Sequence, residues 1–122
     1  MMTAKQWTKW LFTALCAIPW LILFGAYFEI CIARLALSRW PRALTDDPNI
    51  VAIEPLHFLV MLLFLSLVVA TPLVGVLAAW NWRKLLSDWR YSAHIAAFAT
   101  GVLLLWVLID RDPGNVWYWY FD

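Results

Sequence analysis

Three long apolar stretches dominate the pattern of hydrophobic and polar positions along the chain. They run from about 10 to 32, from about 56 to 80 and from about 93 to 109. A helix needs about 20 mainly apolar residues to cross the hydrocarbon core of a bilayer, so the third stretch lies near the lower limit. Polar segments follow the three stretches at 33–55, 81–92 and 110–122. The pattern predicts a single all-α membrane domain, a bundle of three transmembrane helices.

Composition supports a membrane protein and argues against a soluble one. Of the 122 residues, 65% are hydrophobic and 14% are charged, whereas soluble domains are about half apolar and about a quarter charged. A water-soluble fold of this size could not cover so much apolar surface. The formal net charge of +1 gives no reason to expect nucleic acid as a partner.

The first apolar stretch is expected to be a retained helix and not a cleaved signal peptide. Lys5 and Lys9 resemble a basic leader region. The apolar run that follows is too long for such a leader, and no small-x-small cleavage site comes after it.

Tryptophan placement gives a separate check on three spans, because tryptophan favours the membrane interface. Three spans put one group at one face: Trp7, Trp10, Trp80, Trp82 and Trp89. A second group falls at the other face: Trp40, Trp106, Trp117 and Trp119. Only Trp20 is expected in the middle of a span.

Basic residues set the expected orientation. The N-terminus and the second loop carry Lys5, Lys9, Arg83, Lys84 and Arg90, and the other side carries Arg34, Arg39, Arg42 and Arg111. Basic residues are enriched in cytoplasmic loops. We therefore expect a plasma (inner) membrane protein with a cytoplasmic N-terminus and an external C-terminus.

Small residues spaced four apart let membrane helices approach closely. The second stretch has such a row in Thr71, Gly75 and Ala79, and the third has one in Ala93, Ala97 and Gly101. Both rows lie near the short second loop, so they predict a tight hairpin between the second and third helices. Chance is the alternative, since alanine is common in membrane helices.

Two prolines are expected to kink their helices, because proline removes a backbone hydrogen bond and clashes one turn back. They are Pro19 in the first stretch and Pro72 in the second. Such kinks would splay the outer halves of the bundle. The wedge would stay open or receive a partner helix.

The first loop and the tail each carry a distinctive polar pattern. Three arginines in the loop are followed by Asp46, Asp47 and Glu54, which would form an ion-pair network over the bundle mouth or remain solvated. The tail has an Asp-Pro-Gly-Asn turn and then five consecutive aromatics over 117–121. We expect this tail to anchor at the membrane interface; docking on a partner is the alternative.

Ionisable groups within membrane spans are the first candidates for function. Here they gather at the expected outer mouth: Glu29, Arg34, His57, Asp110 and Arg111. A carboxylate beside an imidazole can relay a proton or hold a polar headgroup. The alternative is that each residue only marks a helix end.

No cofactor, metal site or enzymatic activity is expected. His57 and His94 begin successive antiparallel helices, so they fall roughly 30 Å apart and cannot share a haem within one chain. Cys16 and Cys31 would be about 22 Å apart on one helix, too far for a disulfide. The chain also lacks a Cys-x-x-Cys pair, a His-Glu-x-x-His motif, a phosphate loop and a Gly-x-Ser-x-Gly motif.

The leading hypothesis is a small, non-catalytic accessory or structural subunit of a membrane complex. Its expected partners are the bilayer and other membrane subunits, or a second copy of the chain. One alternative is a homo-oligomeric transporter or channel that uses Glu29 and His57. Another is an electron-transfer or quinone-site anchor subunit.

Overall fold

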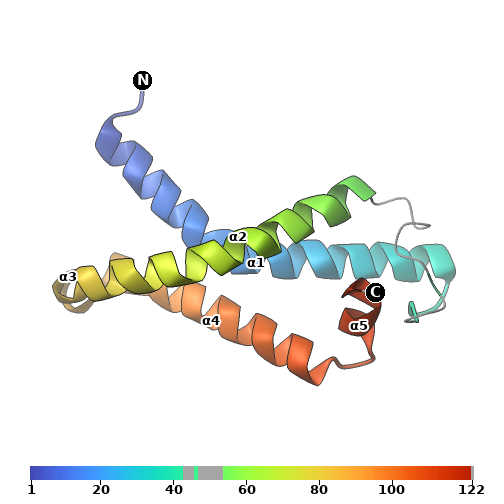
Figure 1. Cartoon of the computed structure of the whole chain (residues 1–122). Helices are drawn as coiled ribbons and strands as arrows, with labels where there is room; N and C mark the ends of the chain where they lie inside the picture. Colours follow the sequence, from blue (N-terminus) through green and yellow to red (C-terminus); the bar gives the residue numbers. More distant parts are fainter. Residues whose placement is uncertain (43–45, 47–53, 122) are drawn as a thin grey trace.

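The computed structural model describes residues 1–42, 46 and 54–121. Within these residues the helices are α1 (Ala4–Leu37), α2 (Glu54–Trp80), α3 (Trp82–Ser87), α4 (Trp89–Arg111) and α5 (Val116–Phe121) (Figure 1). Helices α1, α2 and α4 are long and apolar enough to cross a membrane. The chain is therefore a small multi-pass membrane protein with the all-α fold that the sequence predicts.

The two ends of the bundle are named for the segments found there. The first-loop end holds the C-terminal part of α1, the start of α2, and α5; the N-terminal end holds the start of α1, α3 and the start of α4 (Figure 1). Helix α1 extends beyond the expected span in both directions, and a Thr3–Gln6 capping box begins it.

Helix α1 is the centre of the bundle and packs against both α2 and α4. Its buried face includes Ile22, Ala26 and Ile30, which repeat every four residues and so share one side of the helix. The apolar windows of α2 and α4 are much less buried than that of α1. Their remaining surface is apolar and suits contact with lipid.

Two glycines lie where α1 meets its neighbours closely, Gly25 on α1 facing α2 and Gly101 on α4 facing α1. A Cβ added to Gly25 of α1 would lie 2.7 Å from Val60 Cγ2 of α2, and one added to Gly101 of α4 would lie 2.9 Å from Pro19 Cγ of α1. A Cβ added to Gly75 meets nothing within 4 Å. Close packing therefore joins α1 to each of its neighbours, as small residues allow in lipid.

The structure thus corrects the expected tight hairpin between the two small-residue rows. In the α4 row of Ala93, Ala97 and Gly101, the last two residues contact α1. The Ala97 carbonyl accepts a 2.9 Å hydrogen bond from Trp20 Nε1 of α1. This bond satisfies the indole N–H of the mid-span tryptophan. On α2, Thr71, Gly75 and Ala79 remain exposed.

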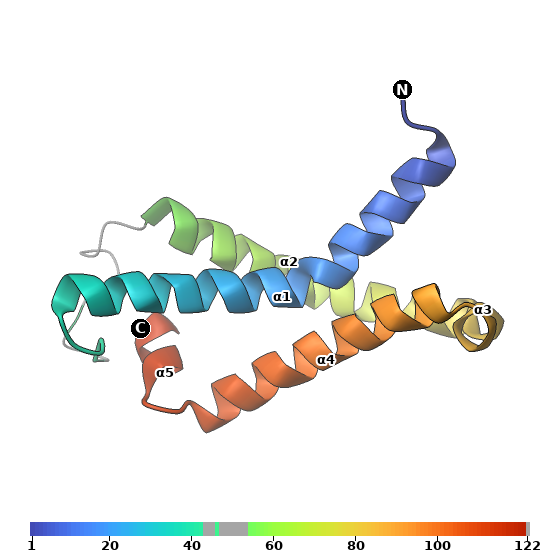
Figure 2. The ribbon, with the colours of Figure 1, turned by 180° about the vertical axis from the view of Figure 1, so that it is seen from behind.

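Of the two prolines, Pro19 produces the larger bend. Figures 1 and 2 show α1 turning sharply in its N-terminal half, so that its start diverges from α3, whereas α2 bends far less. Proline cannot donate to the carbonyl four residues earlier and its ring clashes there. Near Pro72, the Thr71 hydroxyl donates to the Leu67 carbonyl at 2.8 Å, one residue before the carbonyl that Pro72 leaves without its donor.

Helix α5 fills the space between the helices at the first-loop end (Figure 2). The chain reverses through a turn in which Asp112, Gly114 and Asn115 have positive φ. The Asp112 carboxylate then accepts from the backbone N–H of Trp117 at 2.7 Å and of Tyr118 at 2.9 Å. These bonds hold the first turn of α5, whose N–H groups have no partner within the helix.

Burial of α5 corrects the expected role of the aromatic tail. Four of its side chains are buried: Val116, Trp117, Trp119 and Tyr120. Only Tyr118 and Phe121 are exposed among its aromatics. Most of the tail therefore packs inside the protein's own bundle and is not free to anchor in the headgroup layer.

Candidate functional site

A carboxylate and an imidazole meet inside the bundle at the first-loop end. Glu29 of α1 is 3% exposed, and its Oε2 lies 3.1 Å from Nδ1 of His57 in α2. The end of α1 and the start of α2 lie at the same depth because the two helices are antiparallel neighbours (Figure 1). We call this contact the Glu29–His57 pair.

Tyr120 of α5 lies against the Glu29–His57 pair. The centroids of the His57 and Tyr120 rings are 4.8 Å apart. Burial, and then the nearby Glu29 carboxylate, raise the pKa of Tyr120 well above its usual range. Its phenol is protonated at physiological pH, as an ordinary tyrosine is, and its O–H can donate to the Glu29 carboxylate.

Three buried polar atoms in this region have no hydrogen-bond partner among the described residues: Glu29 Oε1, Trp117 Nε1 and Tyr120 OH. Leaving a buried polar group unsatisfied is costly, and such groups in native proteins are commonly explained by a functional role or by bound water. Tyr120 and the Glu29 carboxylate lie close enough for a side-chain interaction that raises the phenol pKa, so each can serve as a partner for the other, and Trp117 Nε1 is the buried donor that no described residue accepts from.

A carboxylate and an imidazole in contact can hold one proton between them. One proton shared by a carboxylate and an imidazole leaves the pair neutral overall, on either side chain. Histidine is suited to proton exchange near neutral pH, and buried ionisable groups in membrane bundles often serve proton pathways. Because α5 covers Glu29, exchange with water would pass by His57 at the edge or require α5 to move.

An aromatic cluster encloses the polar centre. The Trp117 ring makes edge contacts with Tyr27 of α1 at 5.7 Å and with Phe64 of α2 at 6.3 Å between centroids. Phe121 packs against Phe64 at 5.4 Å. Edge-to-face pairs of this kind are favoured by the charge distribution of the rings. Helix α5 is thus wedged between α1 and α2 by specific contacts.

The other residues expected at the mouth do not join the pair. Asp110 and Arg111 are exposed at the end of α4, and within the described part of the chain no ion pair links them to Glu29 or His57. The guanidinium of Arg34 lies 4.1 Å from the centroid of the Trp40 ring. The structure therefore brings together two of the five predicted site residues and adds Tyr120 and Trp117, which the sequence analysis assigned only to an aromatic tail.

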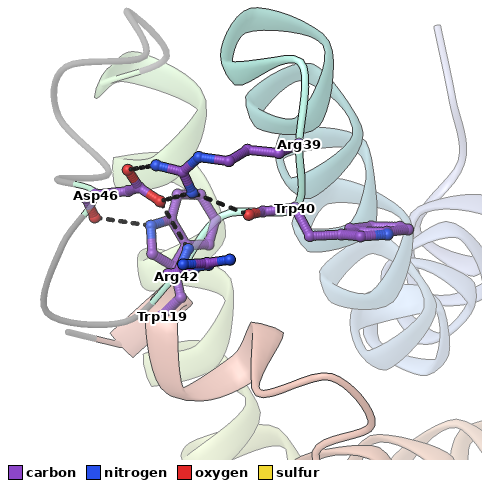
Figure 3. Close-up of polar contacts among 5 residues, drawn as sticks. All are labelled: Arg39, Trp40, Arg42, Asp46 and Trp119. Carbon is purple, nitrogen blue, oxygen red and sulfur yellow. Dashed lines mark hydrogen bonds and ion pairs between the residues drawn. The ribbon is translucent and has the colours of Figure 1, made fainter.

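A polar network joins the first loop to α5 (Figure 3). Both guanidinium NH groups of Arg39 donate to the Asp46 carboxylate at 2.7 Å, and the backbone N–H of Arg42 donates to it at 2.8 Å. The Arg39 guanidinium, then the Arg42 N–H, hold the pKa of Asp46 below its usual range. Trp119 Nε1 donates to the Asp46 carbonyl at 2.8 Å.

This network contains one ion pair of the network that the sequence predicts over the bundle mouth. Arg39 and Asp46 pair as the loop composition suggested; Asp47 and the side chain of Glu54 lie outside the described residues. Through Trp119, the pair also anchors α5 at the loop. Helix α5 is thereby held at its start by Asp112 and near its end by the first loop.

His94 has a structural setting at the N-terminal end. Its Nδ1 lies 2.7 Å from the Arg90 carbonyl, and its Nε2 lies 3.3 Å from the Thr13 hydroxyl. Because a carbonyl only accepts, Nδ1 is the donor to Arg90, and Nε2 is left to pair with the Thr13 hydroxyl. His94 therefore joins α4 to α1, while His57 sits at the opposite end of the bundle.

The fold defines a class: a small, helical, multi-pass membrane protein with one buried polar centre among its described residues. No known protein-family model matches the chain, and no curated protein or solved structure is significantly similar to it. A proposal about its role therefore depends on its own geometry.

Proposed function

We propose that the protein is a non-catalytic accessory subunit of a membrane complex, and that it receives a transmembrane helix of its partner between α2 and α4. The supporting observation is an apolar groove of about 430 Å³ between these helices. Its walls include the small residues Thr71, Gly75 and Ala78 of α2 and Ala99 of α4.

The rest of the bundle supports a helix as the occupant. Gly25 and Gly101 each bring a neighbouring helix into close contact, whereas Gly75 has nothing within 4 Å of its Cβ position. Small residues in membrane helices allow close approach of another backbone. Gly75 is the glycine within the spans whose close-packing surface the chain itself leaves uncovered.

A matched pair of substitutions tests this proposal. Gly75→Leu adds bulk to the groove at a position where the Cβ itself meets nothing within 4 Å, and Ala96→Leu adds bulk at an exposed α4 position outside the groove lining. After mild-detergent extraction from native membranes, Gly75→Leu should reduce co-purification of the partner about tenfold, and Ala96→Leu should not. A lone monomer in the unaltered protein, or equal recovery in both variants, would contradict the proposal.

The Glu29–His57 pair supports a second candidate, a homo-oligomeric transporter or channel that moves protons or couples to them. Here Glu29 holds the proton and His57 passes it to the edge of the bundle. In liposomes with a pH gradient, Glu29→Gln should abolish the flux, and Asp110→Asn, which changes an exposed acid outside the pair, should leave it intact. An unchanged flux in Glu29→Gln would remove this candidate.

We also propose that the N-terminal end faces the cytoplasm of a plasma (inner) membrane. The basic residues near α1 and α3 support this orientation through the positive-inside rule. Single cysteines placed at Lys5 and at Asn115, in a chain without Cys16 and Cys31, would report it. An impermeant maleimide added outside should label only the cysteine at 115, and labelling only at position 5 would reverse the orientation.

A further inference from the structure

The kink in α1 leaves a second groove at the N-terminal end, separate from the α2–α4 groove. On the N-terminal side of the kink, α1 diverges from α3 (Figure 2). A cavity of about 330 Å³ lies between them. Its floor is apolar and includes Leu15 of α1 with Leu73 and Leu77 of α2. The floor therefore suits a hydrocarbon chain and offers little to a soluble ion.

The rim of this groove is cationic. Lys9 of α1 and Lys84 of α3 both line it, and Lys84 Nζ also lies 5.2 Å from the centroid of the Tyr91 ring. Among the described residues, no carboxylate forms an ion pair with either lysine. The one acid nearby in sequence, Asp88, accepts a 3.0 Å hydrogen bond from the Arg90 N–H at the start of α4.

We propose that this groove binds one anionic phospholipid, with an acyl chain on the leucine floor and the phosphate between Lys9 and Lys84. An apolar floor with two ammonium groups at its mouth is complementary to a molecule with a hydrocarbon tail and an anionic head. Both lysines lie near the ends of spans, where long basic side chains reach the headgroup level. A helix from a partner would leave these two charges uncompensated unless it carried matching acids.

The site depends on the bend at Pro19 and not on charge alone. The bend separates the start of α1 from α3, the two segments that carry the lysines, and the leucines line the groove between them. Lys5 and Arg83 are close in sequence to the same segments but do not line the groove. They therefore provide a control with the same change of charge at the same end of the protein.

Native mass spectrometry of the full chain in mild detergent, titrated with phosphatidylglycerol or phosphatidylcholine, tests the proposal. A lysine at an anionic lipid surface changes binding about fivefold, so Lys9→Gln with Lys84→Gln should weaken phosphatidylglycerol binding about 25-fold. Lys5→Gln with Arg83→Gln should have less than a fivefold effect. Leu73→Trp, which fills the groove and keeps both charges, should also reduce binding at least fivefold.

Each contrary outcome overturns the site. Equal weakening in the two double variants would show a general charge effect. Equal affinity for phosphatidylcholine, or displacement by inorganic phosphate at millimolar concentration, would show that the lipid class or the lipid itself is wrong. All substituted side chains are exposed, including Leu73 at 45%, so circular dichroism should show unchanged helicity.

Discussion

The two ends of the bundle differ in how the space between the long helices is occupied. At the first-loop end the space between the long helices is filled by α5, and the buried Glu29–His57 pair lies beneath it. At the N-terminal end the kink at Pro19 opens a groove that the chain does not fill. Among the described residues, α5 closes the first-loop end, and the groove at the N-terminal end stays open.

The largest effect is expected from removing the centre of the α5 contact. Trp117 is 1% exposed and packs edge-on against Tyr27 and Phe64. Trp117→Ala should lower the free energy of unfolding by about 4 kcal/mol, measured by detergent-induced unfolding. Tyr118→Ala, at an exposed position of the same helix, should change it by less than about 0.5 kcal/mol. Similar losses in both variants would mean that α5 does not pack as described.

Breaking the Glu29–His57 pair should have the next largest effect. His57→Phe leaves the Glu29 carboxylate buried without its partner, which should destabilise the fold by about 3 kcal/mol. A second change, Glu29→Gln, removes the unpaired carboxyl group and should recover part of that loss. Unfolding of the two single variants and the double variant gives their coupling energy. Simple additivity would show that the two side chains do not interact.

The two glycines should respond in opposite directions to the same substitution. Gly101→Ala places a Cβ 2.9 Å from Pro19 and should destabilise the bundle by about 2 kcal/mol. Gly75→Ala meets nothing and should be neutral, or stabilising by up to about 1 kcal/mol through helix propensity. Thermal unfolding in detergent measures both. A reversed order would contradict the packing of α4 on α1 and restore the α2–α4 hairpin.

The smallest effect concerns pH at the first-loop end. The pKa of Asp46 is lowered in the folded protein, so its stabilising contribution is present above the ordinary aspartate pKa of about 3.9 and is lost as pH falls below it. Acrylamide quenching of a variant that keeps Trp20, Trp117 and Trp119 and has phenylalanine at the other seven tryptophan positions should rise as pH falls from about 5 to 3. In Asp46→Asn, quenching should be raised at both pH values. A flat response in the unaltered loop would show that Asp46 does not hold α5.

The sequence predicted the three spans, and it predicted that Glu29 and His57 lie at the same end of the bundle. Long apolar stretches are sufficient for spans, and antiparallel succession puts Glu29 beside His57. The central position of α1 was not predictable in the same way. In helices that are apolar on every side, positions facing lipid and positions facing protein have similar side chains.

The fate of the aromatic tail depended on details that composition does not contain. Five consecutive aromatics suit a membrane interface and a protein interior equally well. The choice is made by the positive-φ turn, by the Asp112 carboxylate at the start of α5, and by the hydrogen bond from Trp119 to the first loop. Each of these is a geometric feature that appears only once the chain is folded.

The covering of the Glu29–His57 pair by α5 is the central claim, and solid-state NMR in lipid bilayers tests it most directly. The chain has two histidines and four tyrosines, so labelling these residue types gives a sparse spectrum. The His57 and Tyr120 rings, whose centroids are 4.8 Å apart, should give a cross-peak that disappears in Tyr120→Phe with unlabelled phenylalanine. A Tyr120 ring that shows contacts to lipid headgroups and none to His57 would contradict the account.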